Sequence, residues 1–285
     1  MKKIIYLLAV ILVVACNKKE HNSNATTKSA PSIISIGGAT TETIFALGAG
    51  QHVKAVDVTS TYPNQVHTLP KLGHLSNISF ENALSFNPTN IISIDDQSGT
   101  SLFEQVKQSS TPLNLVKAPQ SVDDTKALIT EIGAVLQKEE EAEALIKIID
   151  ADLAALNDYL SSQQEDAPRV LFIYSRGSDM LMVGGSGTTA DAMITLAGGE
   201  NVGNSFEGFK PLSPEAVIRD NPDVILLFNS GLESLDGIEG VLKMPGIAET
   251  NAGKNKKIVA MDGHYLLGFG PRVGEAALEL AKNIR

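Results

Sequence analysis

The feature that most constrains the fold is a motif that occurs twice in the chain. Residues 79–94 read SFENALSFNPTNIISI, and residues 213–228 read SPEAVIRDNPDVILLF. In each copy, a serine typical of a helix N-cap stands two positions before a glutamate, which falls in the first helical turn. An Asn-Pro pair then ends the helix, and the apolar residues that follow predict a buried strand. The repeat therefore predicts two lobes of similar build.

A second pair of similar segments supports this division. Residues 40–50 read TTETIFALGAG, and residues 188–199 read TTADAMITLAGG. Both predict a capped amphipathic helix that ends at a glycine. The two pairs occur in the same order about half a chain apart, a period too long for a solenoid repeat. Two similar lobes enclose a cleft, and ligands favour such interfaces.

The alternation of predicted strands and helices indicates α/β lobes with largely parallel sheets flanked by helices. We expect an N-terminal lobe at residues 31–137 and a C-terminal lobe at residues 166–285. Between them, residues 138–165 keep apolar side chains at helical spacing and predict one long connector helix of about 35 Å. Because the connector is a single helix, we expect it to be rigid and the ligand cleft to lie between the lobes.

Residues 1–15 have the layout of a secretion signal. A basic start at residues 1–3 precedes an apolar run at residues 4–14 that is too short for a stable membrane-spanning helix. Cys16 follows at once, which resembles a bacterial lipoprotein signal with cleavage before Cys16 and acylation of its thiol. The polar residues 16–30 predict a flexible tether. We therefore expect a periplasmic, membrane-anchored lipoprotein; an ordinary signal peptide with a coincidental cysteine is the alternative.

Composition and missing motifs exclude several classes of function. The net charge of −10 argues against nucleic-acid binding, which needs a basic face. A single cysteine excludes an intramolecular disulfide and a cysteine-cluster metal site. Because the chain has no Gly-x-Ser-x-Gly, His-Glu-x-x-His or Walker motif, we expect no enzyme. One alternative is an exported α/β enzyme that binds a nucleotide at Gly185-x-Gly187-x-x-Ala190; the simpler interpretation is a tight turn before a capped helix.

Several segments, taken in order, resemble one known family. The chain looks like the periplasmic binding proteins with a rigid helical connector that serve ABC importers of haem, cobalamin and ferric siderophores. Its second half is similar to the haem-binding subgroup. The resemblance rests on residues 36–50, 57–63, 69–73 and the segment around Glu81, and then on residues 185–193, 208–215 and 267–272.

The resemblance implies a transported ligand and an iron-binding residue. It implies that haem b is held non-covalently in the inter-lobe cleft and delivered to an ABC permease dimer with its ATPase subunits; cobalamin or a ferric siderophore is the alternative ligand. Tyr62 matches the family's haem ligand, and a phenolate is a known axial donor to haem iron. From the residues alone, Tyr62-Pro63 also fits a turn with an exposed ring.

Two histidines are candidates for a second iron ligand. His74 and His264 lie in loops that the resemblance places at the cleft, although each also fits a residue at its rim. His67, five residues after Tyr62, is expected to be solvated. Some relatives carry a ligand histidine where this chain has Arg176, so we expect Arg176 to pair with a haem propionate instead.

The segment before the last helix supplies further candidates for the pocket. Arg272 fits either a propionate-binding role in the cleft or a cap or inter-lobe salt bridge. Tyr265 and Phe269 are expected to pack on a porphyrin face. Aromatic residues are only 5% of the chain and tryptophan is absent, so aliphatic side chains must complete a flat apolar pocket.

The repeated motif places one glutamate at the same position in each lobe. Glu81 and Glu215 are expected to be exposed at their helix starts, and symmetric carboxylates suit docking onto two basic sockets of a symmetric partner. The resemblance implies the same role, because the family uses matching glutamates against arginines of the permease dimer. The alternative is that each glutamate only stabilises its helix dipole.

Overall fold

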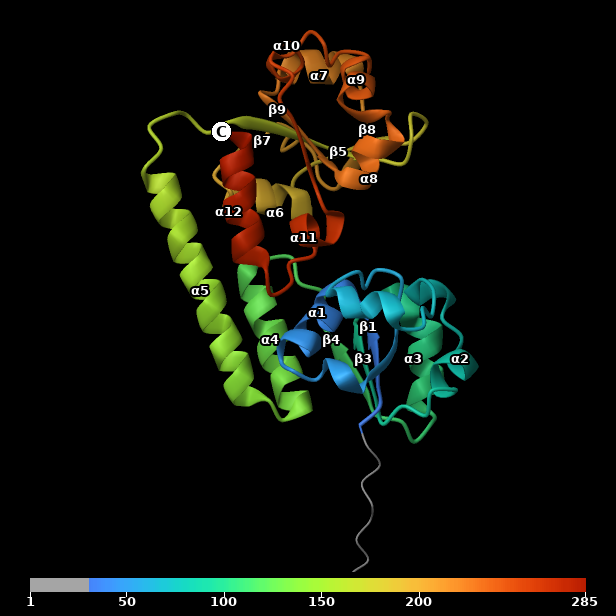
Figure 1. Ribbon diagram of the computed structural model, residues 1–285. Coiled ribbons are helices and arrows are strands. Elements are labelled where there is room, and N and C mark those ends of the chain that lie inside the picture. The colour runs from blue at the N-terminus through green and yellow to red at the C-terminus, as the bar shows by residue number, and fades with distance from the viewer. Residues whose placement is uncertain (1–30) are drawn as a thin grey trace, which may run out of the picture. The chain divides into compact units, whose positions relative to one another are not determined.

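The N-terminal lobe is built on a four-stranded parallel sheet (Figure 1). The computed structural model describes residues 31–285; the predicted signal peptide, Cys16 and the tether lie outside the described residues. The strand order is β2-β1-β3-β4, and every pairing is parallel, as predicted. The strands are β1 (Ile33–Ile36), β2 (Val53–Val56), β3 (Asn90–Ile94) and β4 (Leu113–Val116).

The C-terminal lobe has a mixed sheet of order β10-β9-β5-β6-β8, with β7 paired to β5. The pairings of β10, β9 and β5 are parallel, but β6 and β8 are antiparallel to their neighbours because the chain turns back after β5 near Gly177. This hairpin was not predicted. The strands are β5 (Arg169–Ser175), β6 (Leu181–Gly184), β7 (Glu200–Asn201), β8 (Phe209–Pro211), β9 (Val224–Phe228) and β10 (Ile258–Met261).

Helices flank both sheets. The N-terminal lobe contains α1 (Gly38–Ala46), α2 (Phe80–Leu84), α3 (Thr100–Lys107) and α4 (Val122–Leu136), with short 3-10 turns at Gly50–His52, Asn64–Thr68, Leu75–Asn77 and Gln97–Gly99. The connector is α5 (Glu139–Ser161). The C-terminal lobe contains α6 (Thr189–Leu196), α7 (Pro214–Asp220), α8 (Asn229–Ser234), α9 (Gly237–Leu242), α10 (Asn251–Lys254), α11 (Gly263–Leu267) and α12 (Val273–Ile284).

The repeated motif folds as predicted in both lobes. The Ser79 and Ser213 hydroxyls accept hydrogen bonds from the backbone N–H groups three residues later and cap α2 and α7. Asn87 and Asn221 then adopt left-handed backbone conformations, with φ of 48° and 37°, immediately before the two prolines. The strands that follow are β3 and β9.

The second pair of segments matches the prediction only in part. Thr188 caps α6 by accepting from the backbone N–H of Asp191. By contrast, α1 has no side-chain cap, so the prediction of a threonine cap there is wrong. The helix begins earlier, at Gly37-Gly38, where the Gly37 N–H donates instead to the Asp57 carboxylate, and Thr40 and Thr41 are buried within the helix.

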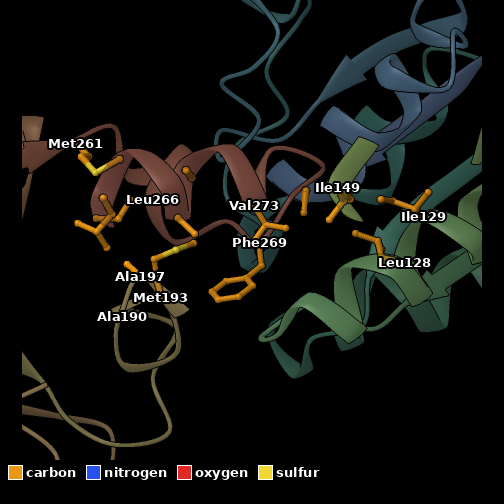
Figure 2. Close-up of a cluster of buried hydrophobic side chains, with 14 of the residues drawn as sticks. Leu128, Ile129, Ile149, Ala190, Met193, Ala197, Met261, Leu266, Phe269 and Val273 are labelled. Atoms are coloured by element: carbon orange, nitrogen blue, oxygen red, sulfur yellow. The ribbon is translucent and has the colours of Figure 1, made fainter. Parts of the chain in front are cut away.

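The lobes are connected by more than a single helix. The predicted connector forms α5, which packs along α12 and α4 (Figure 1). One buried hydrophobic cluster continues from Leu128 and Ile149 on α4 and α5 through Phe269 and Val273 to Met193 on α6 (Figure 2). Two smaller clusters belong to one lobe each. The connector is therefore the outer helix of a packed group that we call the spine: α4, α5 and α12.

A close contact in the spine gives a stability prediction. A Cβ at Gly274 of α12 would lie 2.6 Å from the Cβ of Asp152 on α5, so Gly274→Ala should force the helices apart and destabilise the fold by about 1–3 kcal/mol. Gly231→Ala on α8 is the matched control, because its nearest neighbour would be 3.6 Å away and alanine favours a helix by about 0.5–1 kcal/mol. Urea unfolding measures both, and equal effects would contradict the close packing.

Candidate functional site

The loop after β2 carries Tyr62 and is anchored by a buried carboxylate. Asp57 is 2% exposed. Its Oδ1 accepts from the Gly37 N–H (3.0 Å) and the Ser60 hydroxyl (2.6 Å), while Oδ2 accepts from the backbone N–H and the hydroxyl of Thr59. These bonds satisfy the buried charge and tie the loop to the start of α1.

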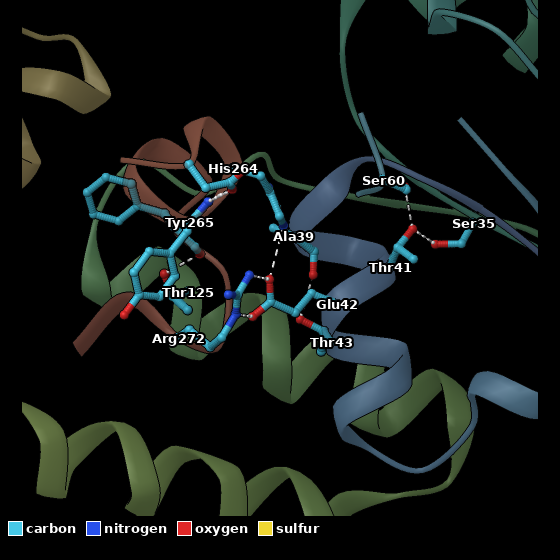
Figure 3. A network of polar contacts seen from close by, with 12 residues as sticks. Ser35, Ala39, Thr41, Glu42, Thr43, Ser60, Thr125, His264, Tyr265 and Arg272 are labelled. Atoms are coloured by element: carbon cyan, nitrogen blue, oxygen red, sulfur yellow. Dashed lines mark hydrogen bonds and ion pairs between the residues drawn. The ribbon is translucent and has the colours of Figure 1, made fainter. Parts of the chain in front are cut away.

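Further bonds hold the same loop from two sides. The Ser60 hydroxyl is linked to Thr41 and, through it, to Ser35, each step being 2.7 Å (Figure 3). Lys71 Nζ donates to the Ser60 carbonyl at 2.6 Å. Partial burial lowers the pKa of Lys71, and the charge of Asp57 offsets part of that shift. The loop backbone is therefore fixed, whereas the Tyr62 side chain is 40% exposed.

Arg272, just before α12, stacks on Tyr62. Its guanidinium carbon lies 3.5 Å from the centroid of the Tyr62 ring and 4.8 Å from that of Tyr265. A cation over an aromatic face is attracted by the ring quadrupole.

Glu42 of α1 holds Arg272 and His264 from the other lobe. Arg272 donates Nε to Oε1 (2.8 Å) and its terminal nitrogen to Oε2 (3.0 Å), and His264 Nε2 lies 3.0 Å from Oε2 (Figure 3). Burial alone would raise the pKa of Glu42, but the bonds from His264 and Arg272 outweigh it and lower the pKa. Burial likewise opposes the charge on Arg272, yet Glu42 keeps its pKa above the usual value.

The two tyrosines under Arg272 are in different electrostatic environments. Burial raises the pKa of Tyr265, and the charges of Glu275 and Glu279 raise it further, against a smaller opposing effect of Arg272. Tyr265 therefore stays a neutral phenol. Tyr62 is more exposed, and its ring lies closer to the Arg272 guanidinium.

Two neighbouring cavities lie between this loop and the C-terminal lobe. One, of about 660 Å³, is lined by Tyr62, His67, Tyr265, Arg272 and Glu279, among others. The other, of about 540 Å³, is lined by Thr59, Tyr174, Arg176, Phe228, His264 and Leu267, among others. Both include Thr61 and Asp262, so they adjoin at these residues.

The structure gathers some of the predicted site residues and separates others. Tyr62, Tyr265 and Arg272 line the first cavity, and Arg176 and His264 line the second. Phe269 lies elsewhere: it is 2% exposed, packed in the hydrophobic core in a left-handed conformation. It cannot contact a ligand from that position.

The remaining predicted residues lie on the surface. His74 is exposed and lines neither cavity. Glu81 and Glu215 are exposed in the first turns of α2 and α7. The Ser213 hydroxyl donates to the Glu215 carboxylate (2.8 Å), which lowers the pKa of Glu215 and keeps it charged.

Sequence reasoning missed two residues of this region, Asp57 and Glu42. His67 is exposed, as expected, and it also lines the same cavity as Tyr62. Asp57 and Glu42 stood inside segments that carried the family resemblance but had no assigned role. A signal was available for Glu42, because it lies on a helix whose other residues are predominantly apolar or threonine.

Three further observations concern the described residues. Within residues 31–285, no group of three or more metal-ligating side chains comes together. In the same range, no helix is both long enough and apolar enough to cross a membrane. The glycine turn at Gly185 is packed against Phe206, whose carbonyl accepts from the Ser186 N–H, so it forms a tight turn before the capped α6.

Two α/β lobes on a helical spine, with ligand-sized cavities lined from both sides, define a bilobal ligand-binding protein. Residues 33–265 match the family described as periplasmic binding protein, and the chain belongs to that family. It is an ABC transporter substrate-binding protein that works outside the cytoplasm, and it is not an enzyme.

Solved structures and curated relatives agree with this family. The fold is similar to the periplasmic heme-binding protein RhuT from Roseiflexus sp. RS-1 (39% identity, 89% of this chain and 97% of that chain, TM-score 0.85). It is also similar to the periplasmic heme-binding protein BhuT in complex with two hemes (33%, 89% and 97%, TM-score 0.84). The uncharacterized ABC transporter substrate-binding lipoprotein YvrC of Bacillus subtilis is 26% identical over 92% of this chain and 83% of that protein. A vitamin B12-binding protein of Pectobacterium carotovorum is 24% identical over 70% of this chain and 71% of its own length.

The anchoring of the loop gives a prediction for Asp57. Asp57→Asn keeps the shape but turns an amide NH₂ group toward N–H and O–H donors, so we expect a loss of about 1–3 kcal/mol in unfolding free energy. Amide hydrogen exchange in residues 58–61 should also become faster. Asp95→Asn, at an exposed position after strand β3 of the same sheet, is the control and should change stability by less than about 0.5 kcal/mol. Unchanged exchange in Asp57→Asn would contradict the anchoring role.

Proposed function

We propose that the protein captures ferric haem between its lobes, with the Tyr62 phenolate as iron ligand, and delivers it to an ABC permease. The observation that carries the proposal is the Arg272 guanidinium stacked 3.5 Å from the ring of an exposed tyrosine. Iron replaces the phenol proton when it binds, and a fixed cation beside the ring attracts the negative charge left on the oxygen. The similarity to RhuT and BhuT, which bind haem, supports the same ligand.

The adjoining cavity offers groups for the rest of a haem. Tyr174, Phe228 and Leu267 supply apolar surface for a porphyrin, and the exposed Arg176 supplies a guanidinium for a propionate. His264 Nε2 is engaged by Glu42, so iron ligation by His264 through that atom requires the ring to leave Glu42. Ligation by His74 requires a haem outside both cavities, so we propose Tyr62 as the protein ligand.

Tyr62→Phe tests the ligand assignment. Removing the phenol oxygen should weaken binding of ferric haem at least about 100-fold, or about 2.7 kcal/mol, and abolish the tyrosinate-type absorption spectrum. Haem titration followed in the Soret band measures both. Tyr159→Phe on α5 is the matched control and should bind as wild type. An unchanged spectrum in Tyr62→Phe would refute the assignment.

The vitamin B12-binding relatives make cobalamin the second candidate ligand. Competition distinguishes the two in one experiment, because both ligands absorb visible light and would occupy the same cavities. Cobalamin in excess should fail to displace haem if haem is the ligand.

We also propose that Glu81 and Glu215 dock the two lobes onto a permease dimer. Each carboxylate is exposed at the start of a Ser-capped helix in equivalent copies of one motif. A symmetric partner can therefore meet both with the same basic socket. Cys16 would carry the lipid anchor and residues 16–30 the tether, in keeping with the lipoprotein YvrC.

Replacing both glutamates tests docking separately from binding. Glu81→Ala with Glu215→Ala should leave haem affinity intact and reduce haem uptake by the reconstituted transporter at least about tenfold, and charge reversal to lysine should reduce it further. Glu131→Ala with Glu233→Ala, two exposed helical glutamates, one in each lobe, is the control. Normal uptake by the first double variant would leave only the helix-dipole role.

A further inference from the structure

We infer that Glu42, which lies behind the iron-binding side chain, is a positioning residue for haem ligation: it holds Arg272 in the stack on Tyr62. The inference rests on the proposed haem-binding function. Glu42 belongs to α1 in the N-terminal lobe, while Arg272 precedes α12 in the other, 230 residues along the chain. The same carboxylate thus joins the lobes and fixes the cation beside the tyrosine.

The Glu42 carboxylate is buried, so its negative charge needs a positively charged partner. The Glu42 side chain is 4% exposed, and an unpaired buried charge is costly. Both oxygens accept from Arg272 in a two-point fork, which fixes the plane of the guanidinium as well as its position. An arginine side chain loses rotamer entropy on ordering, and this fork supplies the restraint.

Two glycines allow Glu42 and His264 to approach the neighbouring backbone closely, and a side chain at either glycine would crowd them. A Cβ at Gly270 would lie 3.2 Å from a Glu42 oxygen, and one at Gly38 would lie 2.6 Å from His264 Nδ1. Phe269 anchors the same segment because its side chain is buried in the core. The residues that lead to Arg272 are therefore held in place, and the fork with Glu42 determines where its guanidinium points.

A purely structural role for Glu42 makes a different prediction. The bond from Thr125 to the Phe269 carbonyl is also buried and also joins the lobes, but it touches neither Arg272 nor Tyr62. If Glu42 only holds the lobes together, variants that lose either contact and are equally destabilised should release haem at equal rates. If Glu42 positions Arg272, only its loss should alter the bond between Tyr62 and iron.

The experiment compares Glu42→Gln and Glu42→Ala with Thr125→Val in the full chain. Haem dissociation rates, the tyrosinate-to-iron charge-transfer band and the unfolding free energy are measured for each. We expect dissociation about 10- to 100-fold faster and a shifted band in Glu42→Ala, with a smaller effect in Glu42→Gln, which still accepts one bond from Arg272. Thr125→Val should lower stability and leave the rate and the band unchanged.

Other results would contradict either the proposed function or the positioning role of Glu42. If haem-loaded wild-type protein shows no tyrosinate band, the proposed function itself is refuted. A wild-type band and rate in Glu42→Gln and Glu42→Ala would overturn the positioning role while leaving haem binding intact. A low-spin histidine–tyrosine spectrum in Glu42→Gln would also overturn it, because Glu42 would then act by restraining His264. If Glu42→Ala fails to fold, the Glu42→Gln and Thr125→Val pair decides between positioning and structural roles.

Discussion

The continuous hydrophobic core that joins the lobes determines how they are placed and, through this, the shape of the cavities between them. It includes α4, α5 and α12 and reaches the C-terminal lobe through Phe269 and Val273. Because this core is closely packed, it resists deformation, and the lobes are held along one side by far more contact area than a single connector helix could provide. The cavities lie at the ends of strands that this core positions, so their walls are largely preformed.

At the junction, one buried charge pair links the core to the ligand site. Glu42 satisfies its carboxylate with donors from the opposite lobe, and one of those donors, Arg272, covers the Tyr62 ring. The same guanidinium is therefore paired with Glu42 and stacked on Tyr62. Burial and neighbouring carboxylates raise the pKa of the adjacent Tyr265.

Local patterns predicted much of the fold. The two motif copies formed α2 with β3 and α7 with β9, and the apolar spacing of the connector formed α5, because capping serines, Asn-Pro pairs and helical periodicity act over a few residues. The short strands β6 and β8 were missed, since strands of three or four residues carry no clear periodicity. The pairing of Glu42 with Arg272 was also missed, because a contact across 230 residues leaves no local pattern. Phe269 was expected to pack on a porphyrin face, but it has a left-handed backbone conformation and its ring is buried in the core.

The most direct test of haem binding through Tyr62 is a crystal structure of the protein with ferric haem, in which anomalous scattering at the iron edge locates the metal. We expect the iron within bonding distance of the Tyr62 oxygen, with Arg272 still stacked on the ring and still paired with Glu42. An iron position away from Tyr62, or bonded to His264 or His74 instead, would contradict the central claim.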